Sequence, residues 1–515
     1  MTPMGTVTAV PGMTNARLWT VLGALMLAVL LSSMEISIIS TALPTIAGEF
    51  NAFESFAWVG TAYIATSAIG TPLLGKLSDL YGRRLIFQVT MGLFIGGSLL
   101  CGFAASMNQL IAFRAVQGLG GGAIQALAFA ILGDILPPRE RGRYIGYFTL
   151  AFVGAALLGP LIGGFIIDHW SWEWIFWINV PLALGASIVS YIALDLPFPR
   201  RATQLDIVGA ALLAIIIGSL MVGLEIGGSD GWTDPLVFVL GAVVLVGLVV
   251  FVVVERRVPE PMIPLHLFSD RVVLASLVCG ASAGAVAFGA GQFLPLYFQD
   301  SLFVSPTESG LRMLPQMIGI TLGTFGIGRL VLWTGRYKQF PVVGTALAAG
   351  GLFMVSQISG TTPYSWLVAP MIAIGFGVAS VFTTTSIATQ NAVDFHDMGV
   401  ATATIMFFRT LGGSIGLAIF GTILTATVRR EIPERLGVTP DEAVSLIRAP
   451  SDIAVLPDAS REAVVDSVAS GVGTIYLVCT GIMIVGFIAA LLLPERELRP
   501  RAGISDALEE AATAS

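Results

Sequence analysis

One carboxylate and one arginine lie deep inside apolar runs, where ionised side chains are costly. Glu35 occurs in a run at roughly residues 18–41 and Arg114 in a run at roughly 109–133. At about 1.5 Å per helical residue, Arg114 is ~8 Å and Glu35 ~9 Å from the outer end of its own run, so the two residues lie at similar depth. Their similar depth predicts a direct or water-bridged contact between the two side chains. Such a buried pair would be a proton-coupling site. The alternatives are a structural ion pair and an arginine that snorkels to the interface.

Other polar side chains inside apolar runs are candidates to line a polar cavity. Hydrogen bonding between helices is an equal alternative for them. Arg409 must face the interior or a partner that the sequence does not identify. The other candidates are Gln117, Gln125, Asn179, Gln292 and Gln316.

A charged loop separates the second and third apolar runs. It reads Gly75-Lys76-Leu77-Ser78-Asp79-Leu80-Tyr81-Gly82-Arg83-Arg84. Gly328-Arg329 and Gly335-Arg336 repeat its glycine spacing in the second half of the chain. Repeated halves are a known plan for transporters, so we expect two related halves. Chance recurrence of Gly-Arg turns is the alternative.

Catalytic, metal and cofactor sites are not expected. Two G-x-S-x-G matches, at 280–284 and 412–416, lie in apolar runs without a histidine, so small-residue helix packing explains them better. The three histidines are far apart, the three cysteines lie in apolar runs, and no Walker A sequence occurs. The net charge of −7 gives no support to nucleic-acid binding. The chain is therefore not expected to be an enzyme.

The elements that must hold these side chains are membrane helices. Of 515 residues, 55% are hydrophobic and 11% are charged, whereas soluble proteins carry about 25% charged residues. A spanning helix needs about 20 apolar residues, and fourteen such runs occur, without the alternation of a membrane barrel. They lie at roughly 18–41, 55–77, 85–106, 109–133, 143–167, 173–194, 205–226, 235–254, 272–299, 309–333, 339–359, 364–390, 399–424 and 472–493.

Basic residues predict the orientation of these helices. With the N-terminus in the cytoplasm, the cytoplasmic links hold arginine clusters, and the short outer loops hold neither Lys nor Arg. Segment 425–471 is the exception, with five arginines against eight acidic residues, but long loops cross with less regard to charge. We expect a multi-pass protein of the plasma (inner) membrane with both termini cytoplasmic.

The division of the chain follows from the runs. We expect an N-terminal six-helix bundle (1–200), an inserted helix pair with a cytoplasmic link (201–271), a C-terminal six-helix bundle (272–500) and a cytoplasmic tail (501–515). In the outer loop 425–471, residues 439–442 fit a capping box and a second short helix is expected near Asp458. The loop therefore predicts a cap of two small helices.

Taken in order, the motifs resemble those of the major facilitator superfamily, specifically its fourteen-helix drug:proton antiporters. The resemblance covers essentially the whole chain. Glu35 stands where the helix-one pattern more often has aspartate, and the second-half loop lacks an acidic residue equivalent to Asp79. The matching segments are Glu35–Pro44, Gly75–Arg84, Arg114–Gly118, Trp170–Trp174 with Asn179–Pro181, and the helix-five antiporter motif formed by Gly154, Gly159, Pro160, Gly163 and Gly164.

This resemblance implies two six-helix bundles plus two inserted helices, working by alternating access as a monomer. It implies proton-driven multidrug efflux of small amphipathic, often cationic, compounds, with a role in antibiotic resistance. Asp79, Arg83 and Arg84 would form a latch between the bundles, with Asp79 facing a helix N-terminus or an arginine. The alternatives are a proton-coupled importer of a nutrient or siderophore and a non-transport membrane sensor or enzyme. The last would need a signalling domain or a catalytic constellation.

Overall fold

The described part of the molecule is built from helices. A computed structural model describes residues 14–50, 56–136, 138–194, 206–229, 231–258, 261, 263–304, 306–394, 397–439 and 456–498. No strand occurs within these ranges. Helices satisfy their own backbone hydrogen bonds, which lipid cannot do. The predicted all-α class is confirmed.

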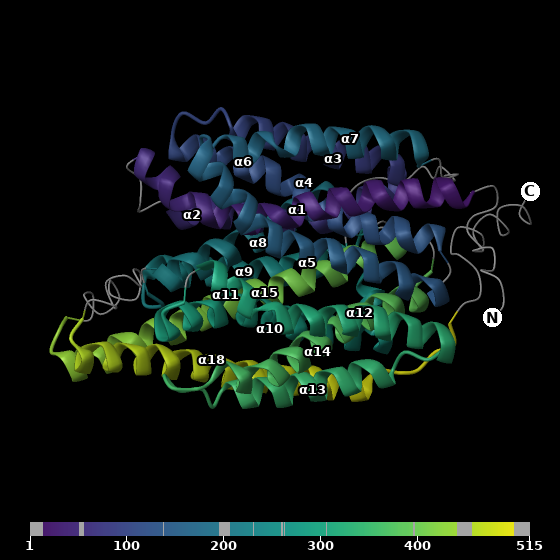
Figure 1. Ribbon diagram of the computed structural model, residues 1–515. Coiled ribbons are helices and arrows are strands. Elements are labelled where there is room, and N and C mark those ends of the chain that lie inside the picture. Colours follow the sequence, from purple (N-terminus) through teal and green to yellow (C-terminus); the bar gives the residue numbers. More distant parts are fainter. Residues whose placement is uncertain are drawn as a thin grey trace, which may run out of the picture.

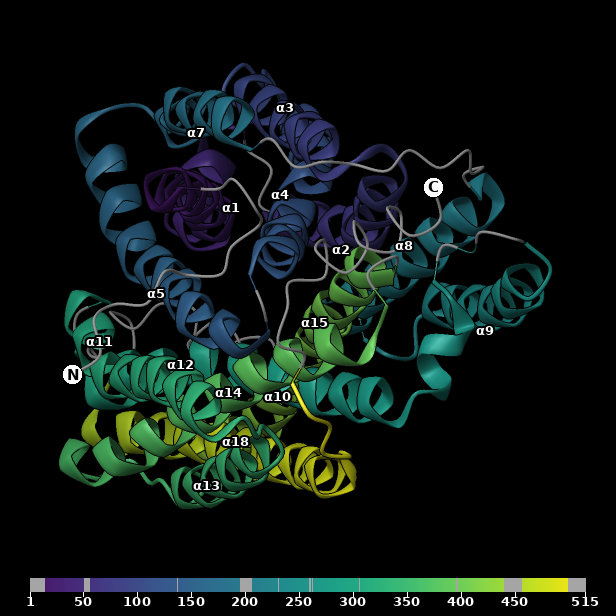
Figure 2. The same cartoon turned by 90° about the vertical axis from the view of Figure 1, so that its right-hand side faces the viewer.

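The N-terminal half forms one bundle, in which α2 and α3 pack against α4, and α5 and α7 pack against α1. Figure 2 shows this bundle end-on as the purple and blue helices. Its helices are α1 (Asn15–Glu49), α2 (Phe56–Tyr81), α3 (Arg83–Cys101), α4 (Met107–Ile135), α5 (Pro138–His169), α6 (Trp174–Trp177) and α7 (Asn179–Ala193).

The C-terminal half forms a second bundle, drawn in green and yellow in Figure 1. In it α10 packs against α15 and α18, and α14 packs against α12 and α13. A short 3-10 helix, η2 (Leu265–Ser269), leads into it. Its helices are α10 (Arg271–Leu302), α11 (Pro306–Arg312), α12 (Leu314–Thr334), α13 (Gln339–Val355), α14 (Tyr364–Ala392), α15 (Met398–Leu436) and α18 (Asp458–Leu492).

Two helices between the halves form a hairpin beside both bundles (Figure 2). They are α8 (Ile207–Ser229) and α9 (Pro235–Glu255), and α8 contacts both α2 and α15. Most side chains of α9 are exposed although nearly all are apolar, including Phe238 and Val249. A helix with this surface suits lipid rather than water.

All fourteen apolar runs fall on helices, but the number of spans stays a prediction. Among the described residues, nine helices are long and apolar enough to cross a membrane, and three shorter apolar helices add to them. Two runs are broken: α6 ends at Trp177 before α7, and α11 ends at Arg312 before α12. Breaks of this kind follow from local packing, which hydropathy alone does not report.

The outer loop differs from the prediction. The helix expected near Asp458 is not separate, because α18 begins at Asp458 and continues without a break to Leu492. The physical reason is apolar continuity: Val464 and Val468 are buried in one cluster with Val428 and Ile432 of α15, so both helices extend past the predicted ends of their spans. The predicted capping box lies largely outside the described residues, which resume at residue 456.

Each bundle has its own apolar core, and the cysteines lie within these cores. Cys101 belongs to the core of the first bundle, which extends across the contact with the second. Cys279 and Cys479 belong to the core of the second bundle. All three are free thiols with 0% exposed surface, so they act as small apolar side chains.

Candidate functional site

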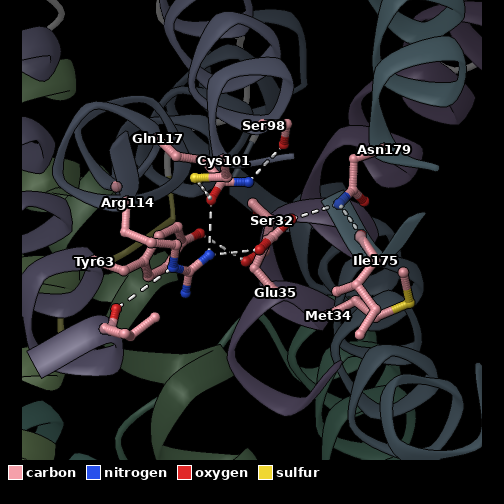
Figure 3. Close-up of polar contacts among 12 residues, drawn as sticks. Ser32, Met34, Glu35, Tyr63, Ser98, Cys101, Arg114, Gln117, Ile175 and Asn179 are labelled. Atoms are coloured by element: carbon pink, nitrogen blue, oxygen red, sulfur yellow. Dashed lines mark hydrogen bonds and ion pairs between the residues drawn. The ribbon is translucent and has the colours of Figure 1, made fainter. Parts of the chain in front are cut away.

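The centre of the N-terminal bundle holds a buried ion pair. Arg114 Nη1 of α4 lies 2.6 Å from Glu35 Oε2 of α1, and neither residue is exposed. The Arg114 side chain also donates to Gln117 Oε1 at 2.7 Å. The equal depths estimated from sequence therefore correspond to a direct contact, which Figure 3 shows.

The second carboxylate oxygen of Glu35 has its own partner. Asn179 Nδ2, at the start of α7, donates to Glu35 Oε1 and to the carbonyl oxygen of Ile175. Gln117 Nε2 donates to Ser98 Oγ of α3 at 2.5 Å. Two predicted cavity residues, Gln117 and Asn179, thus belong to the same hydrogen-bonded network as the ion pair.

Aromatic rings seal the arginine side of this network. The guanidinium carbon of Arg114 lies 4.3 Å from the ring centroid of Tyr63 and 5.8 Å from that of Phe176. Tyr63 donates its hydroxyl hydrogen to the carbonyl oxygen of Ser32 at 3.0 Å, which fixes the ring. A cation over an aromatic face gains stabilisation, most when both are desolvated.

The network is electrically balanced while Glu35 is ionised. A buried ion pair is stable when its remaining hydrogen-bonding groups are also satisfied, whereas removing one charge leaves the other uncompensated. Protonation of Glu35 would leave Arg114 with neutral acceptors only. The strength of the contact between α1 and α4 at this point therefore depends on the charge of Glu35.

A second charged cluster lies where the two bundles meet. Asp79 Oδ2, near the end of α2, accepts a hydrogen bond from the backbone N–H of Val400 in the first turn of α15, at 2.8 Å. Negative charge is favourable at a helix N-terminus. We call this end of the molecule, with Asp79, Asp134 and the start of α15, the Asp79 end.

Arg83 connects this contact to α4. It forms ion pairs with Asp79 and with Asp134 Oδ2, the latter at 2.7 Å, and donates to Ser78 Oγ at 2.5 Å. Arg83 is only 7% exposed, so these pairs are poorly screened by water. Arg84 instead lies over the ring of Tyr191, 4.2 Å from its centroid. Arg83 is thus joined through Asp79 to the α2–α15 contact.

The geometry explains both glycines of the charged loop, Gly75 and Gly82. Gly82 separates α2 from α3 with φ of 96°, a conformation that favours glycine. At Gly75, an added Cβ would lie 2.6 Å from the Cβ of Ala403 in α15, so glycine permits this close approach between the bundles.

The helix-five motif is closely packed at one of its glycines. Gly159 faces Ser37 of α1, whose hydroxyl donates to the carbonyl oxygen of Ala155 at 3.1 Å. By contrast, an added Cβ at Gly154 would approach only Leu30, at 3.9 Å, and at Gly164 it would meet nothing within 4 Å. Gly163 is buried, and the side chain of Pro160 lies outside the described residues.

Three of the remaining cavity candidates, Gln125, Gln316 and Arg409, have surroundings that the structure describes, and none of the three bonds to the Glu35 network there. Gln125 Nε2 donates to Ser33 Oγ at 3.3 Å. Gln316 Oε1, in α12, is buried and has no hydrogen-bond partner within the described ranges. Arg409 lies against α14, where it donates to the carbonyl oxygen of Phe382. The side chain of Gln292 lies outside the described residues.

Sequence reasoning missed several members of the two clusters. Tyr63 is an ordinary aromatic residue in an apolar run, and nothing in its spacing singles it out. Val400 contributes a backbone N–H, which no sequence motif reveals. Asp134 carries a usable signal, because it is an acidic residue at the end of an apolar run two residues after Leu132.

Known proteins are similar to this chain in sequence and in fold. The sequence model of the Major Facilitator Superfamily matches residues 25–417. Multidrug resistance protein 3 of Bacillus subtilis is 32% identical over 491 residues, covering 93% of this chain and 95% of that protein. An uncharacterized MFS-type transporter of Mycobacterium tuberculosis is 34% identical over 477 residues, covering 92% of this chain and 69% of that protein.

The solved structure of the proton:xylose symporter XylE superposes with a TM-score of 0.60 at 13% identity. It covers 96% of this chain and 100% of the XylE chain. At that identity the likeness concerns the fold alone.

Proposed function

Because the chain belongs to the major facilitator superfamily, we propose that it is a proton-coupled antiporter that exports small amphipathic compounds by alternating access. Its place in this superfamily makes it a membrane transporter and not an enzyme. The similarity to a protein named for multidrug resistance supports drugs or natural products as cargo.

The observation that carries the proposal is the Glu35–Arg114 pair. Glu35 is a carboxylate with 0% exposure, inside an apolar helix, and forms an ion pair with Arg114. A carboxylate in the membrane interior is by default a functional group. Its proton affinity depends on burial and on its distance from Arg114, and both change when helices move. One site can therefore bind a proton in one conformation and release it in another.

The exchange of proton for cargo follows from the same group. Loading Glu35 with a proton removes the charge that holds Arg114, and the two protonation states then stabilise different arrangements of α1 and α4. A cationic compound competing for the carboxylate would have the same electrostatic effect as the proton. Competition between the proton and the compound for Glu35 is therefore sufficient for antiport.

The Asp79 contact supplies the gate of this proposal. Asp79 of α2 and the N-terminus of α15 belong to different bundles, so their contact closes one end of the molecule. We place the Asp79 end in the cytoplasm of a plasma-membrane protein that acts as a monomer with both termini inside, in accord with the arginine distribution. In this arrangement the state described here is closed toward the cytoplasm.

The test is transport in proteoliposomes with an imposed pH gradient. Purified protein is reconstituted, and a panel of amphipathic dyes is followed on either side of the membrane. Antiport predicts that dye moves against the proton flow and that a protonophore abolishes the movement. Movement in the same direction as protons would support an importer instead. No gradient-dependent movement of any compound would overturn proton coupling.

A further inference from the structure

Arg409 is a buried arginine held by neutral groups. Its Nη2, which carries two hydrogens, lies within hydrogen-bonding distance of three acceptors in α14: the carbonyl oxygen of Phe382 at 2.7 Å, Thr385 Oγ1 at 2.8 Å and Ser386 Oγ at 2.9 Å. Its Nη1 contacts the thioether of Met406, and its guanidinium carbon lies 4.6 Å from the ring centroid of Phe382. Among the described residues, its Nε has no hydrogen-bond acceptor. The side chain is 8% exposed. Part of its hydrogen-bonding capacity is therefore unused.

The other two arginines that are buried among the described residues are neutralised. Arg114 pairs with Glu35, and Arg83 pairs with Asp79 and Asp134. No carboxylate in the described part of the chain pairs with Arg409. An arginine inside a membrane protein is costly without a counter-charge, and such residues face the interior or a pathway.

Arg409 lies at a different level from the proton site. It is about nine residues along α15 from Val400, or ~14 Å from the Asp79 end, whereas Arg114 is about twenty residues, or ~30 Å, from Asp134. Val400 and Asp134 mark the same end, because both contact the Asp79–Arg83 cluster. A compound that enters from the Asp79 end therefore reaches the level of Arg409 first.

The helix that carries Arg409 lies at the contact between the bundles. Phe407, two residues before Arg409 and therefore on the opposite side of α15, is buried with Ala65 and Ala68 of α2, in the first bundle. The Arg409 side chain itself points toward α14 and α10, where an added Cβ at Gly280 would lie 3.4 Å from its Cγ. If α15 moves away from α2 between transport states, this part of the helix opens to the transport path.

We propose that Arg409 binds an anionic group of the transported compound, so that the cargo includes amphipathic carboxylic acids and zwitterions. This inference rests on the proposed transport function. Guanidinium suits oxyanions because its planar donors match their acceptors. The incoming carboxylate supplies the missing counter-charge and takes the unused donor, while Thr385 and Ser386 hold the guanidinium in place.

The test compares pyrenebutyric acid with its primary amide, which differ in charge but little in shape. Binding to purified protein in nanodiscs is measured at neutral pH and corrected with empty nanodiscs. The wild type should bind the acid at least about tenfold more tightly than the amide, the size expected for a charged hydrogen bond. Arg409→Gln should reduce this preference to less than about twofold, and Arg409→Lys should retain part of it.

The matched control is Arg430→Gln, which removes an arginine from the same helix where its side chain is 70% exposed. This control should keep the wild-type preference. Equal binding of acid and amide by the wild type, or an undiminished preference in a folded Arg409→Gln protein, would overturn the proposal. If Arg409→Gln does not fold, the wild-type comparison and Arg409→Lys decide.

The two hypotheses fail in different ways. Gradient-driven movement of dyes together with equal binding of acid and amide removes the anion site alone. Selective binding of the acid without gradient-driven movement of any compound removes the proton-coupled function and leaves Arg409 as a binding residue.

Discussion

Glu35 has two partners that respond differently to its charge. Arg114 is attracted to the carboxylate by an ion pair, whereas Asn179 donates a hydrogen bond that a neutral acid can also accept. Protonation therefore weakens the contact with α4 more than the contact with α7. The charge of Glu35 therefore sets how strongly α1 is held to α4 relative to α7.

The first prediction concerns this carboxylate. Glu35→Gln keeps the size and one hydrogen-bond-accepting oxygen but removes the titratable group, so uphill, pH-driven transport should fall to the level of empty vesicles. Glu35→Asp should retain some transport, because it keeps the charge one methylene further from Arg114. Both variants are compared with wild type in proteoliposomes at matched protein amounts. Undiminished pH-driven transport by Glu35→Gln would show that another group carries the proton.

The second prediction concerns stability. Arg114→Gln alone leaves a buried carboxylate without its cation and should lower the free energy of unfolding by about 3–5 kcal/mol at neutral pH. The double variant Glu35→Gln/Arg114→Gln should lose clearly less than the sum of the single changes, because it removes both charges. Denaturation in detergent measures all four proteins. Additive losses would mean that the pair contributes no coupling energy.

At the scale of elements, the contact between α2 and α15 combines charge with close packing. Asp79 binds the first turn of α15, and Gly75 allows α2 to approach Ala403 one turn further along. The charge acts only when the helix surfaces are close, because a hydrogen bond to a backbone N–H is short-ranged. The contact should therefore be either formed or broken.

The third prediction follows for the gate. Asp79→Asn removes the negative charge at the start of α15 and should increase the population open at the Asp79 end. Spin labels on cysteines introduced at Tyr81 and Gln339, exposed positions in the two bundles at that end, report the distance distribution. The matched control is Asp134→Asn, which removes the other carboxylate of Arg83 but does not bond to α15. The same shift in both variants, or in neither, would contradict the role of Asp79.

How much of this was predictable depends on the range of the interaction. The helices follow from apolar runs, because burial in lipid is a property of each segment. The Glu35–Arg114 contact follows from the matching depth of the two residues, which can be counted along each helix from the sequence. The rotation of each helix about its axis depends on packing, so the placement of Asn179 beside Glu35 and the acceptors of Arg409 could not be predicted. The extension of α18 to Asp458 was missed because its apolar face is interrupted by charged residues in sequence.

At the scale of the whole molecule, two bundles meet at one end through residues far apart in the chain. Tyr147 of α5 and Phe325 of α12 form an edge contact with ring centroids 5.5 Å apart, and Gln390 Nε2 donates to the carbonyl oxygen of Phe129 at 3.2 Å. Together with the Asp79 contact, these interactions join three helices of the first bundle, α2, α4 and α5, to three of the second, α12, α14 and α15. Rocking of one bundle on the other must break all of them.

The fourth prediction concerns orientation. Gln339 is the first residue of α13, and Gln357 lies two residues after its last residue. Both are exposed, and they lie about 27 Å apart along the helix axis. If the Asp79 end is cytoplasmic, an impermeant thiol reagent should label Gln357→Cys in intact cells and Gln339→Cys only after permeabilisation. The reverse pattern would invert the molecule in the membrane and, with it, the direction of proposed transport.

The burial of all three native thiols has a practical consequence for such work. Reagents modify thiolates that reach water, and Cys101, Cys279 and Cys479 have no exposed surface. The three native cysteines should therefore react slowly with thiol reagents, and a cysteine introduced at an exposed position should be labelled much faster. Labelling of a native cysteine during turnover would then be informative in itself, because it would report an opening of a bundle core that this state keeps closed.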